Sequence, residues 1–327
     1  MAKLLQQARD MLRMNHYSLK TERSYLHWME RYIRFHKLRH PREMGTNEVT
    51  AFVSHLAVSE HVSPSTQNQA LAGVLYLYRQ VLGIELDRID AIRAKGEQHI
   101  PAVLSIDETL RLLDNLQGVY RLIGDLLYGS GLRLNEALQL RVKDVDFEHC
   151  ALTIRNTKSN RDRIVPLARQ ATEPLRLHLA KMKAQHDEDL SRGYGSVELP
   201  YALAKKYPNA EFEWGWQYVF PAAGFSADPR SGVVRRHHIF ETTIQRAVKA
   251  AARQAGIVVP VGPHTLRHCF ATHLLQSGAD IRTVQEVMGH KDVKTTMVYT
   301  HVLNRGGLVV TSPLDRCANL VSTARAG

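Results

Sequence analysis

A break between residues 89 and 104 divides the chain into two segments with different secondary-structure patterns. The break reads IDAIRAKGEQHIPAVL, is rich in charge, and contains Gly96 and Pro101, which interrupt regular structure. A chain of 327 residues is too long for one ordinary domain and long enough for two. We therefore predict two domains joined by a linker at 89–104.

The segment 1–88 has the periodicity of α-helices throughout. Apolar side chains recur at steps of three and four residues between Tyr25 and Phe35, as in a helix with one buried face. Two later helices have cap candidates in Thr46 and in Ser63 or Ser65, and Gly83 is a candidate for a helix end. The first domain is predicted to be a small helical bundle.

The segment 105–327 mixes helices with a short sheet. Ser105 is a candidate N-cap, and helical sequence follows it to Leu140. Alternation around Leu152 and Ile154, a polar turn at 156–161, and then Ile164 with Val165 predict a β-hairpin. Helices dominate again from residue 241, so the predicted fold class is mainly α, with a mixed α/β second domain.

The charge balance favours a polyanionic partner. The chain has 43 Lys and Arg against 32 Asp and Glu, a net charge of +11, and basic side chains that bind phosphates release condensed counterions. A basic surface kept for solubility is the alternative. Three well-separated cysteines without CxxC spacing fit a reducing cytosol, and no signal peptide or membrane span is evident.

Four motifs in the second segment carry candidate functional side chains. They are GSGLRLNEAL with Arg133, the hairpin turn with Lys158, HTLRH with His264 and Arg267, and MGHKDVKTTMVYTH with His290 and Tyr299. Taken singly, each has an ordinary structural explanation: an ion pair of Arg133 with Glu136, a solvated turn lysine, a capping histidine beside a salt-bridging arginine, an exposed tyrosine. Pro263 starts a helix whose first turn is expected to place His264 and Arg267 on one face, and Thr295 and Thr296 are a cap-like pair.

Together these residues supply the groups needed to break a phosphodiester with a side-chain nucleophile. Such a reaction needs a hydroxyl that later leaves, cationic donors for the non-bridging oxygens, and a proton donor for the departing sugar oxygen. No pair of acidic residues at metal-ligand spacing accompanies them, so a metal-dependent nuclease has little support.

The motifs, in this order, resemble the signature of the tyrosine recombinase (phage integrase) family. The resemblance implies that Arg133 and Arg267 clamp the scissile phosphate, that Lys158 protonates the leaving 5′ oxygen, and that Tyr299 forms a 3′-phosphotyrosine. His264 would assist proton transfer and His290 would donate to a non-bridging oxygen, while Glu136 would help hold the site together. Rejoining should then need no cofactor, neither ATP nor metal.

An insertion at about 185–223 resembles that of integron integrases, which recombine folded single-stranded cassette sites as well as duplex attachment sites. The spacing of Trp214, Trp216, Tyr218 and Phe220 is strand-like, and one face packed into the core is the plain interpretation. By the resemblance, Trp216, with His237 and His238 of the RRHH run and Trp214 nearby, would contact bases that bulge from a hairpin stem. A basic patch that binds phosphate is the alternative for RRHH.

The same resemblance implies a homotetramer acting on two DNA sites in the bacterial cytoplasm, on the nucleoid. The tail at 303–327 would dock on a neighbouring subunit, or is otherwise disordered. Two rival hypotheses remain: a Xer-like or phage-type recombinase acting on duplex sites, and a DNA-binding protein that keeps the fold without the chemistry.

Overall fold

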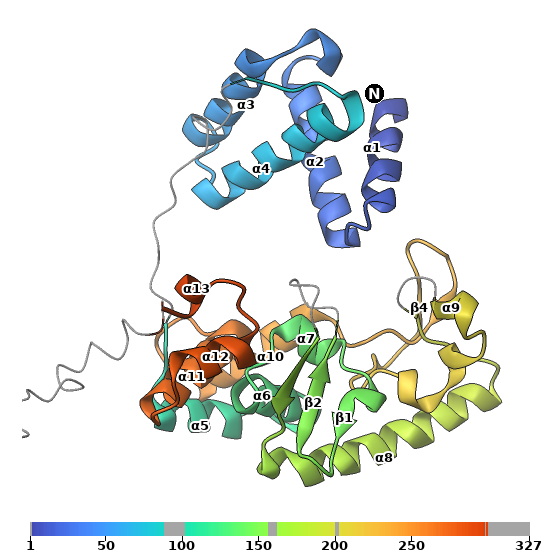
Figure 1. Cartoon of the computed structure of the whole chain (residues 1–327), viewed down its shortest axis with the longest axis vertical. Helices are drawn as coiled ribbons and strands as arrows, with labels where there is room; N and C mark the ends of the chain where they lie inside the picture. Colours follow the sequence, from blue (N-terminus) through green and yellow to red (C-terminus); the bar gives the residue numbers. More distant parts are fainter. Residues whose placement is uncertain (1, 88–101, 156–161, 200–202, 298, 300–327) are drawn as a thin grey trace, which may run out of the picture. The chain divides into compact units, whose positions relative to one another are not determined.

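The computed structural model describes residues 2–87, 102–155, 162–199, 203–297 and 299, and it divides into two compact units, 1–99 and 100–327 (Figure 1). Three predictions lie wholly or largely outside the described residues: the linker, Lys158 in the hairpin turn, and the tail at 303–327. Within the described ranges, no helix has the length and apolar character to cross a membrane.

The first unit is a helical bundle, as its periodicity predicts. Its elements are α1 (Ala2–Met14), α2 (Leu19–Phe35), η1 (Pro41–Glu43), α3 (Thr46–Val58), α4 (Pro64–Tyr76) and the π-helical turn η2 (Leu77–Leu82). Helices α2 and α4 pack together over a core that includes the buried side chains of Tyr32, Phe52 and Tyr78. The Tyr32 and Tyr78 hydroxyls are 2.8 Å apart, which satisfies both polar groups inside this core.

The helix ends of this unit confirm two of the predicted caps and correct a third. The Ser63 hydroxyl accepts from the Thr66 N–H, and Gly83 ends η2 with a left-handed φ of 68°. Thr46 as an N-cap is wrong, because Gly45 takes that position and its N–H donates to Glu48 Oε2 at 2.8 Å. The Thr46 hydroxyl instead donates to the Asp87 carbonyl oxygen.

The second unit combines helices with two small antiparallel sheets. Its elements are α5 (Ile106–Asp114), α6 (Gly118–Gly129), α7 (Leu134–Leu138), η4 (Val142–Asp144), β1 (Val145–Asp146), β2 (Ala151–Ile154), β3 (Arg163–Pro166), α8 (Arg169–Ser191), α9 (Leu203–Lys206), η5 (Ala210–Phe212), η6 (Trp214–Trp216), β4 (Ser226–Ala227), β5 (Val234–Arg235), α10 (Glu241–Gln254), α11 (Pro263–Gln276), α12 (Ile281–Met288) and α13 (Val293–Met297). Ser105 caps α5 as predicted, and Leu104, expected in the linker, is buried in the core of this unit.

The predicted β-hairpin is confirmed by strands β2 and β3. Leu152 pairs with Val165 in the antiparallel register, and both side chains are buried, whereas Ile164 is 70% exposed on the opposite face. Strand β1 completes a sheet in the order β1-β2-β3. Strand β3 also contacts α12, a helix more than 110 residues away in sequence.

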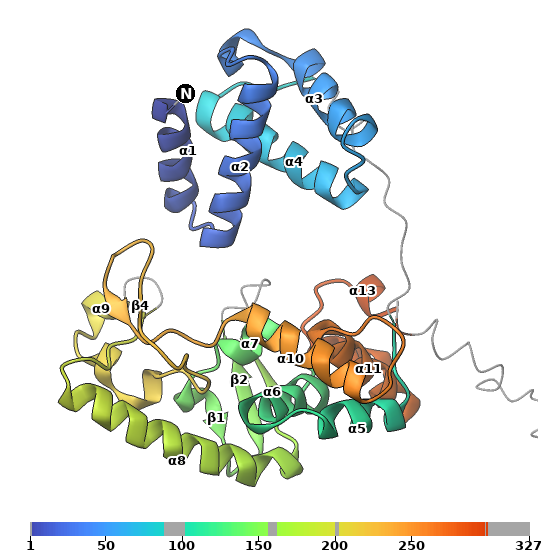
Figure 2. The same cartoon turned by 180° about the vertical axis from the view of Figure 1, so that it is seen from behind.

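The insertion differs from its predicted strand-like form. It begins inside α8, and Trp214–Trp216 form a 3-10 turn rather than part of a strand. Tyr218, Val219 and Phe220 are all buried, and the backbone here pairs with residues 140–142 through Val142 N to Gln217 O and Val219 N to Leu140 O. Figures 1 and 2 place α8 and α9 toward one end of this unit and α11–α13 toward the other.

Gly131, in the turn between α6 and α7, generates our first prediction. Its φ is 64°, and a β-carbon there would collide with the Phe270 ring. Gly131→Ala should lower the free energy of unfolding by about 3 kcal/mol, since left-handed strain adds to overpacking. Gly256→Ala is the control, because Gly256 also has a positive φ of 69° but open space around it. Urea titration should show the larger loss for Gly131→Ala, and equal losses would contradict this explanation.

Candidate active site

Five segments of the second unit bring the candidate residues of this site together. Arg133 is the N-cap residue of α7, Arg163 opens β3, Arg267 lies in the second turn of α11, His290 follows α12, and Tyr299 follows α13. Gly289 ends α12 in the left-handed conformation, with φ of 61°, and this turn directs the chain back toward α11.

The carboxylate of Glu136 is the centre of this cluster. It accepts from Arg163 at 3.0 and 2.7 Å, from the Arg133 guanidinium at 2.7 Å and from the Arg133 backbone N–H at 2.8 Å. Arg267 Nη1 lies 3.7 Å from Glu136 Oε2. One carboxylate therefore orients three guanidinium groups, and the bidentate pair with Arg163 is the most tightly defined of these contacts.

The same arginines bind the carbonyl groups at the C-terminal end of α12. Arg163 Nε donates to Val287 O at 2.9 Å, Arg267 Nη2 to Met288 O at 2.5 Å, and Arg133 Nη2 to Gly289 O at 3.2 Å. The last carbonyl oxygens of a helix have no N–H donors within the helix and carry partial negative charge. Successive carbonyls of α12 thus anchor the three arginines, and Arg267 also donates to Gly131 O.

The charges of this cluster shift the pKa values of its members. Burial alone would raise the pKa of Glu136, but hydrogen bonds and ion pairs with Arg163 and Arg133 hold it at about 2. Burial, together with the nearby Arg133 charge, lowers the pKa of Arg267 to about 10. At neutral pH Glu136 is ionised and Arg267 keeps its proton, so positive charge exceeds negative charge in the cluster.

His290 contacts both the arginine cluster and α13. Its Nδ1 lies 3.0 Å from the Thr296 hydroxyl and its Nε2 lies 3.4 Å from Arg267 Nη2. Thr295 and Thr296 are inside α13 rather than at its cap. Burial and the charges of Arg267 and Arg133 lower the pKa of His290 to about 4, so the imidazole is neutral at pH 7.

Tyr299 is buried, with only 4% of its surface exposed, rather than an exposed tyrosine near the chain's end. Its ring is nearly parallel to that of His290, at 6.2 Å between centroids, and its hydroxyl lies 2.9 Å from His268 Nδ1. Burial raises the pKa of Tyr299, while Arg267 and Arg133 act in the opposite direction. The phenol is therefore protonated at neutral pH.

His264 and Arg267 lie three residues apart near the start of α11, but they differ in exposure. His264 is exposed in the first turn of α11, whereas Arg267 is 4% exposed. Arg267 reaches Glu136 and the end of α12 inside the unit, whereas His264 is exposed between the buried residues Pro263 and Thr265. His268, one residue after Arg267, is the histidine that contacts Tyr299.

Sequence analysis did not single out Arg163 or His268. Arg163 had a usable signal: it is two residues before Val165, so strand alternation places its side chain on the buried face of the sheet. A charged residue at an inward position calls for a buried partner. His268 had no comparable signal, because its role depends on where Tyr299 is placed by tertiary structure.

The predicted base-contacting residues form a separate group in the insertion. Lys143 Nζ lies 2.8 Å from the centroid of the partly exposed Trp216 ring. The His237 and His238 rings are 4.0 Å apart, and both meet Tyr218 edge-on. His238 is buried, with 9% exposed and its Nδ1 2.8 Å from the Ile239 carbonyl oxygen, whereas His237 is half-buried.

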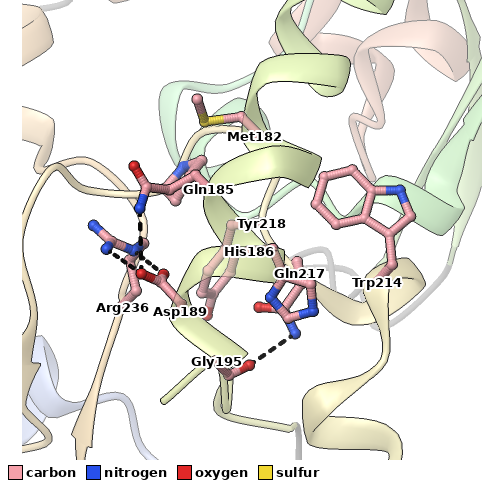
Figure 3. A pocket seen from close by; sticks show the side chains of 10 residues that line it. Met182, Gln185, His186, Asp189, Gly195, Trp214, Gln217, Tyr218 and Arg236 are labelled. Carbon is pink, nitrogen blue, oxygen red and sulfur yellow. Dashed lines mark hydrogen bonds and ion pairs between the residues drawn. The ribbon is translucent and has the colours of Figure 1, made fainter. Parts of the chain in front are cut away.

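Trp214 lines a small cavity against α8, shown in Figure 3, together with His186, Tyr218 and Arg236. In that cavity Arg236 makes a bidentate ion pair with Asp189, at 2.6 and 2.8 Å. Arg235 pairs with Glu211 at 3.0 Å. Both arginines of RRHH are thus engaged within the protein, which weakens the interpretation of this run as an open phosphate-binding patch.

Both units match models of known protein families. The phage integrase family model matches residues 102–305, and the model of the phage integrase N-terminal SAM-like domain matches residues 4–88. An Escherichia coli protein described as integrase/recombinase is 50% identical over 321 residues, 98% of this chain and 95% of its own length. Tyrosine recombinase XerD of Agrobacterium fabrum is 34% identical over 281 residues, 80% of this chain and 77% of its own length.

Solved structures confirm the predicted fold class. XerH site-specific recombinase bound to palindromic difH substrate, in a post-cleavage complex, has a TM-score of 0.61 and 19% identity, and the match covers 90% of this chain and 81% of that one. A lambda integrase dimer bound to a COC′ core site has a TM-score of 0.59 and 16% identity over 91% of this chain and 94% of that one. At these identities the likeness shows the fold.

Removal of the charge of Glu136 should destabilise the second unit in a pH-dependent way. Its folded-state pKa of about 2 lies below the ordinary value of 4.5 for a glutamate, so its ionisation contributes about 3 kcal/mol that is fully present above pH 4.5 and is lost as pH falls toward 2. Urea titrations of the wild type and Glu136→Gln should therefore differ most near pH 7 and converge in acid. Glu148→Gln, at an exposed position, is the control, and a difference that stays constant with pH would contradict the prediction.

Proposed function

The chain belongs to the phage integrase family of tyrosine recombinases, enzymes that cleave and rejoin DNA, and we propose that it recombines specific DNA sites through a covalent bond between Tyr299 and a backbone phosphate. The observation that carries this proposal is the convergence of Arg133, Arg267, His290 and Tyr299 from distant segments on one buried, positively charged cluster. Such a cluster suits a phosphodiester in which negative charge develops during displacement.

Each residue has a role in this proposal that follows from its chemistry. Arg133 and Arg267 bind the non-bridging oxygens, since a planar guanidinium can donate two parallel hydrogen bonds to a phosphate. Lys158 protonates the leaving 5′ oxygen, His290 donates to a non-bridging oxygen, and His264 assists proton transfer. Glu136 orients the arginines, as its contacts support.

The balance of bonds explains why no energy source is required. The Tyr299 oxygen replaces the 5′ oxygen on phosphorus, so one phosphodiester is exchanged for another and the free 5′ hydroxyl can reverse the step. Strand exchange is nearly isoenergetic, and direction must come from DNA binding and assembly. We infer a homotetramer on two sites, acting on DNA of the bacterial nucleoid in the cytoplasm.

The nucleophile can be tested with a suicide substrate, a folded site nicked near the cut, incubated in EDTA. We expect a covalent protein–DNA adduct on a denaturing gel with the wild type and its complete loss in Tyr299→Phe, because only the hydroxyl is removed. Tyr207→Phe is the control, since that tyrosine is exposed in the insertion. An adduct formed by Tyr299→Phe would exclude the proposed nucleophile, and tight binding without an adduct from the wild type would favour the binding-only hypothesis.

We further propose that the substrates include folded single-stranded cassette sites of integrons, with an extrahelical base stacked on Trp216. The partly exposed indole supports this, although the Lys143 ammonium covers one of its faces. A base would therefore stack on the open face or displace Lys143 toward a neighbouring phosphate. His237 lies close enough to Tyr218 and His238 to form a second aromatic wall, and Trp214 lies nearby in the cavity against α8 that Tyr218 also lines.

Action on ordinary duplex sites is the second candidate, and the relatives described as XerD favour it. Both candidates share the chemistry at Tyr299. They differ in substrate, because a duplex offers no bulged base to the insertion.

Trp216→Ala should separate these two candidates. If the indole stacks a bulged base, the variant should bind the folded site about 10 to 100 times more weakly, since stacking contributes about 1–3 kcal/mol per base. Binding to the matched duplex should stay within twofold, and Trp216→Phe should restore part of the loss. Equal effects on hairpin and duplex, measured by gel shift at one salt concentration, would remove support for extrahelical-base recognition.

A further inference from the structure

His268 makes the hydrogen bond to the Tyr299 hydroxyl, although the motif comparison assigns it no role. Its Nδ1 lies 2.9 Å from Tyr299 Oη, and the two ring centroids are 5.6 Å apart with an interplanar angle of 47°. Tyr299 is 4% exposed, so bulk water has little access to this side chain. The contact is therefore the direct route from the phenol to a nitrogen base.

We propose that His268 accepts the phenolic proton of Tyr299 when the tyrosine attacks DNA. This inference rests on the proposed role of Tyr299 as the nucleophile. In the step, the Oη–P bond forms while the P–O5′ bond breaks, and the proton moves from Oη to Nδ1 of His268. The 5′ oxygen takes a proton from the general acid, for which Lys158 is proposed, and both protons return during rejoining.

The electrostatics of the site supply both a proton to move and a base to receive it. Burial raises the pKa of Tyr299, so the phenol carries its proton at neutral pH. Burial, with His264 and Arg267 nearby, lowers the pKa of His268 to about 4, so this imidazole is neutral at pH 7. With its own proton on Nε2, the Nδ1 lone pair faces the phenol and can accept a hydrogen bond.

The other histidines of the site are less well placed for this transfer. His290 directs Nδ1 to Thr296 and Nε2 to Arg267, so both of its nitrogens are engaged away from the phenol. His264 is exposed, one helical turn before His268 on α11. His268 combines a hydrogen bond to the attacking oxygen with a position beside Arg267, which binds the phosphate in the proposed mechanism.

The test is single-turnover cleavage of the suicide substrate by full-length His268→Asn. The Asn side chain can still place a polar atom near the former Nδ1 position, but it is not a base. We expect cleavage about 100-fold slower, in the range of general-base catalysis, with DNA affinity within twofold. The decline of the wild-type rate at acid pH, where His268 becomes protonated, should be shallower in the variant, in which only His290 titrates in the same range.

A substrate with a 5′-bridging sulfur distinguishes proton transfer from Tyr299, the proposed role of His268, from proton transfer to the leaving 5′ oxygen. A thiolate departs without a proton, so this substrate should rescue Lys158→Ala but should leave His268→Asn slow. Wild-type rates in His268→Asn, or its rescue by the sulfur substrate, would overturn the proposal. An adduct formed by Tyr299→Phe would instead refute the nucleophile itself, which is a different outcome.

A measurement on the wild type covers the case in which His268→Asn fails to fold. In protein labelled with ¹³C at the tyrosine Cζ, the Tyr299 resonance, identified by its absence in Tyr299→Phe, should shift as His268 titrates in acid. A resonance that does not respond between pH 3 and pH 7 would show that the two side chains do not share a proton, and would overturn the proposal.

Discussion

The ion cluster around Glu136 is the interaction on which the rest of the site depends. One carboxylate faces the guanidinium groups of Arg133, Arg163 and Arg267, so positive charge exceeds negative charge in the cluster. Buried charges of one sign repel each other unless a counter-charge is present. Glu136 supplies part of that counter-charge, and a bound phosphate would supply more. The excess positive charge of the cluster therefore favours binding of an anion such as phosphate. The carboxylate of Glu136 already holds the arginines in position before such a ligand binds.

The end of α12 gives the cluster its second set of contacts. Carbonyl oxygens of Val287, Met288 and Gly289 each accept from a different one of these arginines. Arginines from distant segments of the chain therefore bind the C-terminal end of one helix, where the partial negative charge of the carbonyl groups favours cations. A shift of α12 would move the arginines together with His290, so the position of this short helix determines whether the whole constellation is assembled.

Sequence reasoning predicted the components of the site better than their contacts. Arg133, Arg267, His290 and Tyr299 were predicted because phosphoryl transfer needs those residue types and the motifs contain them in a familiar order. Strand parity would also have indicated Arg163. The choice between His264 and His268, four residues apart on one helix, could not be made from the sequence, because it depends on where the chain after α13 places Tyr299. The strand-like form predicted from the aromatic spacing at 214–220 was wrong at Trp214–Trp216, which form a 3-10 turn, and Val219 is buried together with Tyr218 and Phe220 instead of alternating with them.

In the proposed mechanism, charge stabilisation and proton transfer are carried by different residue types. Arginines keep their charge across the physiological range, whereas burial and those same arginines lower the pKa of both His268 and His290 to about 4. Before DNA binds, the histidines are therefore neutral and weakly basic. A phosphate placed among the arginines would offset the positive potential that lowers these pKa values, and each histidine would become a stronger base. By this argument the substrate itself raises the basicity of the groups that act on it, so that proton transfer from Tyr299 is favoured when a scissile phosphate is in place.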